Sequence, residues 1–263
     1  LLEVTIRRDG NVHSMAFSGG EKTADLAVTG SCGKRNTGTG IRFKPDPAYF
    51  DSANFSIPKL SHALRAKAVL CPGLRVTLTD EKKKEKIEWH YEDGIADYLA
   101  DATIDFPVIP ETPFTAHFEG ETEAVDWAIQ WLPEGGEVIA ESYVNLIPTT
   151  QGGTHVNGLR SGLLDAMREF CELRNLLPRG VKLTAEDVWD RCCFVLSSKL
   201  QDPQFSGQTK ERLSSREAAG FVSGVAKDAF GLWLNQETAD AERLAELCIC
   251  LLYTSDAADE RLG

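Results

Sequence analysis

The chain has 263 residues, which is enough for two modest domains with separate hydrophobic cores. Its 42% hydrophobic and 26% charged residues are typical of a globular protein. No stretch reaches the roughly 20 apolar residues that a membrane helix needs. The formal net charge of −12 argues against a surface that binds nucleic acid all over, although it leaves room for a local basic groove.

The cysteines exclude a zinc domain. They form no C-x-x-C pair and no His/Cys cluster with zinc-ligand spacing, so we expect no metal site. Seven scattered thiols, an odd number, fit the reducing cytoplasm. Cys171, Cys192 and Cys193 lie in apolar patterns and are predicted to be small core residues.

The first third of the chain mixes strands and helices. Alternation predicts β structure over residues 1–45, with a turn at 8–11, and a loop is expected at 46–54. Four glycines in 30–40 fit either a ligand-facing hairpin or a glycine-rich turn between edge strands. The pattern then predicts a helix with Ser56 as N-cap, ended by 71–73, and a short helix from Gly94. The lysine-rich stretch at 81–86 could contact DNA, but its two glutamates favour a solvated hairpin turn.

A change in composition marks a candidate domain boundary. Three prolines between Phe106 and Pro113 predict a stiff extended connector. We therefore expect one domain over 1–105, a second over 106–235, and a trailing helical segment over 236–263.

The second domain opens with predicted strands at 114–118, 122–132 and 137–144. A strongly amphipathic helix follows, with Thr154 as the expected N-cap and Gly152-Gly153 as the tight loop before it. No Gly-Lys-Ser/Thr follows those glycines, so they do not predict a phosphate-binding loop. His155 is expected to form local hydrogen bonds at the helix start.

Two arginines of this helix, Arg160 and Arg174, fall within about 40° of each other on the helical wheel. They fit a stripe that faces a polyanion such as DNA. Equally, they fit exposed arginines that pair with Asp165 or Glu169.

The remaining loop, residues 202–213, lies between a predicted buried strand at 192–200 and a helix beginning at 214–217. Gln208 and Lys210 are two residues apart, so in an extended backbone their side chains would point the same way. An amide that donates a directed hydrogen bond and a mobile ammonium together suit a phosphate. A surface loop with one solvated lysine is the alternative.

Several motifs, in register along residues 1–247, resemble bacterial type IIA DNA topoisomerase B subunits. The similarity is closest to the topoisomerase IV B subunits, with the gyrase B subunits as near relatives. The motifs are Cys-Gly-Lys-Arg-Asn-Thr-Gly-Thr at 32–39, Lys-Ala-Val-Leu-Cys-Pro-Gly at 67–73, Gln-Gly-Gly-Thr-His at 151–155, and Gln-Phe-Ser-Gly-Gln-Thr-Lys at 204–210.

This resemblance implies an α+β fold in which the C-terminal part of a GHKL ATPase α/β sandwich precedes a transducer domain, a mixed sheet with packed helices. It implies that Lys210 contacts the γ-phosphate of ATP as the catalytic group and that Gln208 supports it. Thr39 would lie in the adenine-side wall of the pocket, and Arg160 would line the cavity through which DNA passes.

The resemblance also implies function and partners. The expected activity couples ATP binding and hydrolysis to DNA strand passage and decatenation in the cytoplasm, with ATP and Mg²⁺ as cofactors. The expected partners are DNA, the topoisomerase IV A subunit and a second B subunit, in an A2B2 assembly. Supercoiling by gyrase, and a non-catalytic interaction module with the same fold, are the alternatives.

The sequence departs from the family pattern at both ends. The family's general-base Glu, magnesium-binding Asn, adenine-reading Asp and glycine-rich lid are expected upstream of Leu1, so this polypeptide alone is predicted to be inactive. From about Cys248 the chain looks like translated sequencing-adapter read-through, and no function is expected there.

Overall fold

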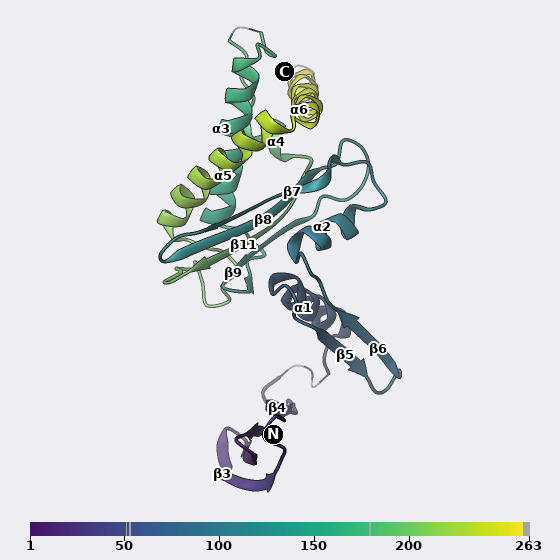
Figure 1. Cartoon of the computed structure of the whole chain (residues 1–263), viewed down its shortest axis with the longest axis vertical. Coiled ribbons are helices and arrows are strands. Elements are labelled where there is room, and N and C mark those ends of the chain that lie inside the picture. Colours follow the sequence, from purple (N-terminus) through teal and green to yellow (C-terminus); the bar gives the residue numbers. More distant parts are fainter. Residues whose placement is uncertain (51, 53, 179, 260–263) are drawn as a thin grey trace. The chain divides into compact units, whose positions relative to one another are not determined.

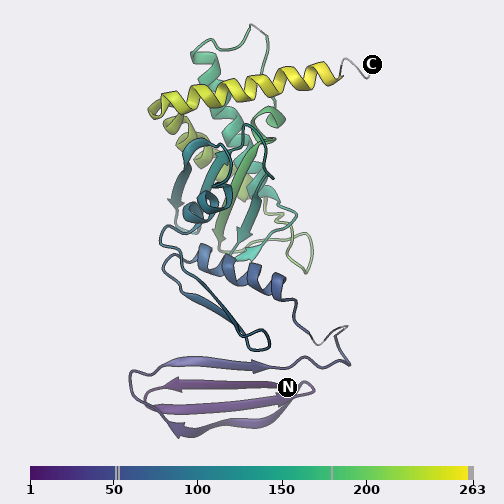
Figure 2. The ribbon, with the colours of Figure 1, turned by 90° about the vertical axis from the view of Figure 1, so that its right-hand side faces the viewer.

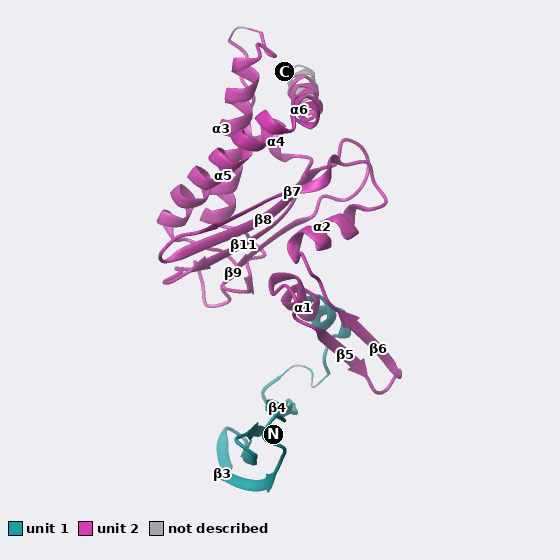
Figure 3. Cartoon of the chain, viewed as in Figure 1, with its two compact units in different colours: residues 1–63 teal, residues 64–263 magenta. Residues whose placement is uncertain are grey.

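The computed structural model describes residues 1–50, 52, 54–178 and 180–259. They form two compact units, residues 1–63 and 64–263 (Figure 3). This division does not coincide with the predicted boundary at 106, and the assignment to domains 1–105, 106–235 and 236–263 stays a prediction. Residues 51 and 53 of the predicted loop, and 260–263 of the predicted tail, lie outside the described residues.

The first unit contains a four-stranded antiparallel sheet whose strands run side by side in the order β3-β2-β1-β4 (Figure 2). Asp9 and Gly10 join the first two strands with φ angles of 54° and 83°, which is the left-handed geometry of a two-residue hairpin. The β structure predicted for 1–45 is confirmed. The strands are β1 (Leu2–Arg8), β2 (Asn11–Ser18), β3 (Glu21–Ser31) and β4 (Gly38–Phe43).

The glycine-rich segment does not close a hairpin. β3 and β4 are the two edges of the sheet, so residues 32–37 cross from one edge to the other. The amide of Cys32 donates to the carbonyl oxygen of Gly10 at 2.8 Å and attaches this crossing to the β1–β2 turn. The hairpin expectation is therefore wrong, and the turn between edge strands is confirmed.

Two helices and a hairpin follow. α1 (Ile57–Leu70) begins directly after Ser56 and ends before Cys71, as predicted, and its residues from Leu64 on belong to the second unit. β5 (Val76–Asp80) and β6 (Glu85–Trp89) form an antiparallel hairpin, with the lysine-rich stretch as its exposed turn. α2 (Ile95–Thr103) is the predicted short helix.

The second unit is built around a five-stranded mixed sheet in the order β10-β9-β11-β8-β7. β11 runs parallel to β9, and the other neighbours are antiparallel. The predicted connector is wrong from Ile109 on, because Ile109 pairs with Trp131 and begins the edge strand. The strands are β7 (Ile109–Glu119), β8 (Glu123–Trp131), β9 (Ala140–Val144), β10 (Ile147–Pro148) and β11 (Cys192–Leu200).

Helices cover both faces of this sheet, with α3 and α5 on one face and α2 on the other (Figure 1). This arrangement confirms the α+β class with a mixed sheet and packed helices. Cys171, Cys192 and Cys193 are buried, as predicted. The remaining helices are α3 (Thr154–Leu173), α4 (Ala185–Trp189), α5 (Arg216–Gln236) and α6 (Thr238–Asp259).

Glycines allow α3 and α5 to approach closely. A Cβ placed on Gly158 would lie 2.5 Å from the carbonyl oxygen of Ala219, and one on Gly162 would lie 2.5 Å from that of Ser223. Both distances are below van der Waals contact with main-chain atoms that cannot rotate away. The two helices therefore pack backbone to backbone, a contact that larger residues would prevent.

Candidate functional site

The loop that carries Gln208 and Lys210 connects β11 to α5 and closes on itself. Phe205 and Leu213 form an antiparallel bridge. The amide of Ser206 donates to the carbonyl oxygen of Arg212 at 3.0 Å, and that of Ser214 donates to Gln204 at 2.8 Å. These bonds hold the two arms of the loop together, so its tip extends from a paired stem.

The tip is a turn rather than an extended segment. The amide of Lys210 donates to the carbonyl oxygen of Gly207 at 3.1 Å, which places Gln208 and Thr209 at the two central positions of a β-turn. Lys210 then adopts a left-handed φ of 58°. The expectation that an extended backbone points both side chains the same way is therefore wrong, because a turn and a left-handed residue separate them.

Lys210 is exposed, and its ammonium is available to a ligand. Its Nζ lies 5.7 Å from the centroid of the Phe205 ring, within the range of a cation–π contact. No carboxylate in the part of the chain that the structure describes forms an ion pair with it. A lysine whose ammonium lies over an aromatic ring and has no carboxylate partner among the described residues suits an anionic group.

The base of the loop is anchored in a small apolar cluster. Leu213 is 1% exposed and packs with Val144 and Ala218, and Phe205 and Leu200 lie against them. The tip is therefore polar and exposed, while its stem is part of a hydrophobic core.

The start of α3 differs from the prediction. Gly153, not Thr154, is the N-cap, and the hydroxyl of Thr154 has no hydrogen-bond partner among the described residues. Gly153 can take this place because its φ of 137° is open to glycine. Gly152 and Gly153 do form the predicted tight loop.

His155 is buried at the start of α3 and takes part in a local polar network. Its Nε2 lies 3.1 Å from the hydroxyl of Thr149, which in turn lies 2.6 Å from that of Ser142. Burial lowers the pKa of His155 to about 4, so its imidazole is neutral near pH 7. The prediction of a local hydrogen bond is confirmed.

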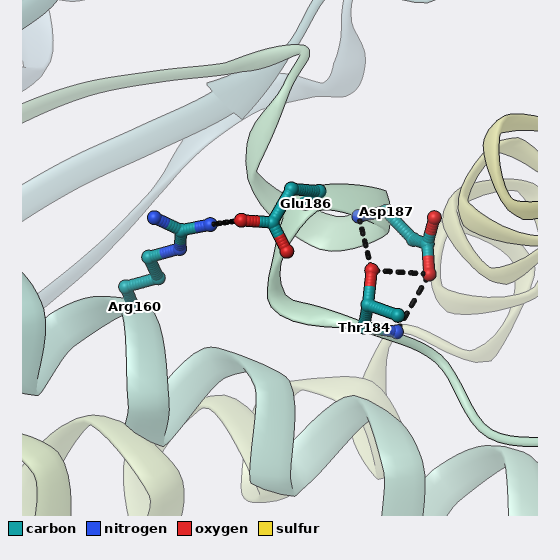
Figure 4. Close-up of polar contacts among 4 residues, drawn as sticks. All are labelled: Arg160, Thr184, Glu186 and Asp187. Carbon is teal, nitrogen blue, oxygen red and sulfur yellow. Dashed lines mark hydrogen bonds and ion pairs between the residues drawn. The ribbon is translucent and has the colours of Figure 1, made fainter. Parts of the chain in front are cut away.

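Arg160 projects from α3 toward α4 and forms an ion pair with Glu186 (Figure 4). The predicted pairing of the helix arginines with Asp165 or Glu169 is wrong, since Glu169 pairs with Lys227 instead, at 2.6 Å. Arg174 is also occupied. Its guanidinium lies 2.7 Å from a carboxylate oxygen of Glu242 and 4.6 Å from the centroid of the Phe170 ring.

A capping box holds Glu186 in place. Thr184 and Asp187 cap α4 reciprocally: the amide of Thr184 donates to Oδ2 of Asp187 at 2.6 Å, and the amide of Asp187 donates to Oγ1 of Thr184 at 3.5 Å (Figure 4). A backbone hydrogen bond and the guanidinium of Arg160 lower the pKa of Glu186. The carboxylate is thus charged at neutral pH and competes with any phosphate for Arg160.

Thr39 belongs to the first unit. It lies in β4 opposite Ile6 of β1, and it is exposed. An exposed hydroxyl at a sheet edge can contact a ligand, and its predicted role at the adenine stays a prediction.

The described residues contain no cluster of metal ligands and no membrane-spanning helix. Their His, Cys, Asp and Glu side chains do not gather in any group of three or more that could bind a metal ion. No helix among them combines the length and the apolar character needed to cross a membrane.

Sequence reasoning missed three residues of this region: Gln151, Glu186 and Glu211. The Thr-x-x-Asp spacing at 184–187 is a capping-box signal that could have located α4 more firmly. The partners of Arg160 and of Gln151 could not have been found, because they lie 26 and 60 residues away in the chain.

Comparison with known proteins identifies the family. A sequence profile described as DNA gyrase B matches residues 94–261, which is more than half of the chain. This chain belongs to the DNA gyrase B family. The resemblance that four motifs carried is therefore confirmed.

Individual relatives agree with that assignment. The B subunit of DNA topoisomerase 4 from Salmonella typhimurium is 66% identical over 94% of this chain, and the match spans 39% of that relative's length. The solved topoisomerase IV ATP-binding domain of Francisella tularensis has a TM-score of 0.81 and 39% identity, over 100% of this chain and 70% of that one. The 43K ATPase domain of Thermus thermophilus gyrase B has a TM-score of 0.79 and 27% identity, over 99% and 70%.

Proposed function

We propose that this chain is part of the ATP-hydrolysing subunit of a type II DNA topoisomerase of the topoisomerase IV kind. In that subunit it couples ATP binding and hydrolysis to DNA strand passage and decatenation. The topoisomerase IV B subunit of Salmonella typhimurium at 66% identity supports this choice over gyrase, of which the B subunit from Halalkalibacterium halodurans is 36% identical. We place the activity in the cytoplasm and in an assembly with DNA, an A subunit and a second B subunit.

The observation that carries the proposal is the geometry of Lys210. An exposed ammonium, with which no carboxylate of the described residues forms an ion pair, stands at the tip of a stem that is held by backbone hydrogen bonds. Phosphoryl transfer is catalysed mainly by positioning and by stabilising negative charge, so one well-placed ammonium at the terminal phosphate is a credible catalytic group. Gln208, in the same turn, supports it as a hydrogen-bond donor.

Other residues take secondary roles. Thr39 contributes to the wall of the nucleotide pocket on the adenine side. Arg160 contacts the DNA backbone, and a phosphate must first displace Glu186 from its guanidinium. Magnesium accompanies the nucleotide, but the described residues offer no cluster of ligands for it, so no step through the metal is assigned to them.

The test is ATP turnover by the complete subunit carrying Lys210→Ala. We expect a loss of about 100-fold or more, the effect of removing one group that stabilises transition-state charge. Lys83→Ala is the matched control, because Lys83 is an exposed turn lysine with no ion pair among the described residues. Turnover by the Lys210 variant equal to that of the control would refute the role of Lys210.

A further inference from the structure

The loop that carries Lys210 is attached to the segment in front of α3. The amide of Gln151 donates to the carbonyl oxygen of Glu211 at 2.9 Å, and the amide of Leu213 donates to Gly152 at 3.1 Å. Thr154 returns a third bond to Leu213, also at 3.1 Å. The first of these bonds is one residue beyond Lys210, so it acts directly on the conformation of the tip.

A side-chain contact repeats this attachment. Nε2 of Gln151 donates to Oε2 of Glu211 at 3.0 Å. Both side chains are exposed, so the pair adds little to the hydrophobic core. Its effect is to hold Glu211, the residue after Lys210, against Gln151, which lies two residues before the N-cap of α3.

Gly153 sets how closely the two segments approach. A Cβ at this position would lie 2.3 Å from the carbonyl oxygen and 2.5 Å from the amide nitrogen of Leu213. Neither atom belongs to a flexible side chain. Any larger residue at 153 must therefore push the 204–213 loop away from α3 or break the bridge between Gly153 and Leu213.

The attachment leads into the closely packed helix pair of the unit. Gly153 directly precedes α3, and Leu213 lies three residues before α5. The two helices pack backbone to backbone at Gly158 and Gly162. The left-handed φ of Lys210 is unfavourable for a lysine. The paired stem and the attachment to the start of α3 together hold the loop in the conformation that requires this angle.

We propose that Gln151 and Gly153 are positioning residues for Lys210: by binding Glu211 and Leu213 to the start of α3, they hold the lysine where it meets the terminal phosphate of ATP. This inference rests on the proposed role of Lys210. The two residues act through the loop and touch no substrate themselves.

The experiment exchanges the amide and the carboxylate of the exposed pair, Gln151 and Glu211, in the complete subunit. Gln151→Glu places a second carboxylate beside Glu211, and we expect ATP turnover to fall about threefold to fivefold. The affinity for ADP, which lacks the terminal phosphate, should stay within about twofold of the parent. Adding Glu211→Gln restores an amide–carboxylate hydrogen bond in the opposite sense and should return turnover to within about twofold of the parent.

Matched controls separate position from fold. Gln201→Glu makes the same chemical change at an exposed glutamine before the stem and should leave turnover unchanged. Gly153→Ala should lower ATP turnover further than Gln151→Glu does. If the Gly153 variant does not fold, the variants of the Gln151–Glu211 pair still test the positioning role.

The outcomes are distinguishable. A normal rate for Gln151→Glu, or a double variant that stays as slow as the single one, would overturn the positioning role while leaving Lys210 as the phosphate contact. An equal loss of ADP affinity would also overturn it, because positioning of Lys210 affects only the terminal phosphate. If Lys210→Ala itself turns over normally, both proposals fail together.

Discussion

The α3–α5 helix pair and the 204–213 loop are neighbours in one unit, yet they are built in opposite ways. The facing sides of the two helices are buried, and glycines bring their main chains into contact. The loop is exposed at its tip, with polar residues and a left-handed lysine. We therefore expect the helix pair to contribute to stability and the loop to carry the proposed phosphate contact.

Only a short segment of each region takes part in the contacts that join them. Three backbone hydrogen bonds and one side-chain pair link the loop to residues 151–154, which lead into the first turn of α3. A loop whose backbone is already held in place loses less conformational entropy on binding a ligand than a free one, so these contacts favour the proposed engagement of Lys210 with a phosphate.

The largest expected effect lies in the helix pair. Gly162→Ala places a Cβ 2.5 Å from the carbonyl oxygen of Ser223 and 2.8 Å from the Cβ of Ala226, so α5 must shift. We expect the free energy of unfolding of the second unit to fall by about 3 kcal/mol, the upper end of the usual cost of overpacking a core, because the added Cβ meets main-chain atoms. Denaturant titration followed by tryptophan fluorescence measures it.

The control lies in the same helix pair and has the opposite sign. Gly220 of α5 has nothing within 4 Å of an added Cβ. Gly220→Ala should therefore stabilise the unit by about 0.5–1 kcal/mol, through helix propensity and a less flexible unfolded chain. Equal destabilisation by both alanines would contradict the close approach of α3 to α5.

The second prediction concerns acid stability at the start of α3. The pKa of His155 is lowered from about 6.5 when unfolded to about 4 when buried. As the pH falls from 7 to 4.5, the unfolded chain binds a proton that the folded protein does not, so stability falls by about 2 kcal/mol.

Replacement of the imidazole tests this origin. His155→Gln should lower stability at pH 7 and remove most of its pH dependence between 7 and 4.5. His62→Gln, at an exposed histidine of α1, should leave both unchanged. A pH dependence that survives in the His155 variant would assign it to other groups.

These two regions also show where sequence analysis succeeds. The bounds of β11 and the start of α5 were predicted closely, because apolar runs and caps are local signals. The Thr154 cap failed because Gly153, pressed against Leu213 from a distant segment, took that position. The connector predicted at 106–113 is wrong from Ile109 on, since Ile109 pairs with Trp131 of β8. The next pair along the strand joins Phe114 and Ile129, so residues 110–113 lie in an irregular stretch.

The candidate site was predictable only in part. The motif at 204–210 pointed to Lys210. The sequence pattern did not predict the left-handed turn at Lys210 or the attachment of its loop to residues 151–154. Both depend on contacts between segments about 60 residues apart, which periodicity does not report.

The smallest expected effect concerns Arg160, which lies on the rigid helix rather than on the loop. Glu186→Gln weakens the ion pair, and we expect DNA affinity of the complete subunit to rise about twofold to threefold, since exposed ion pairs are weak. Fluorescence anisotropy with duplex DNA at two salt concentrations measures it. Glu172→Gln, on the same helix, should change nothing; an equal rise there would reflect net charge alone.

The most direct test of the account compares two nucleotides on one variant. In the complete subunit, Lys210→Ala should lower the affinity for a non-hydrolysable ATP analogue about tenfold or more, the value of a charge-assisted hydrogen bond, and leave ADP affinity within about twofold. Isothermal titration calorimetry measures both. A variant that binds both nucleotides as the parent does, or loses both equally, would contradict a contact between Lys210 and the terminal phosphate.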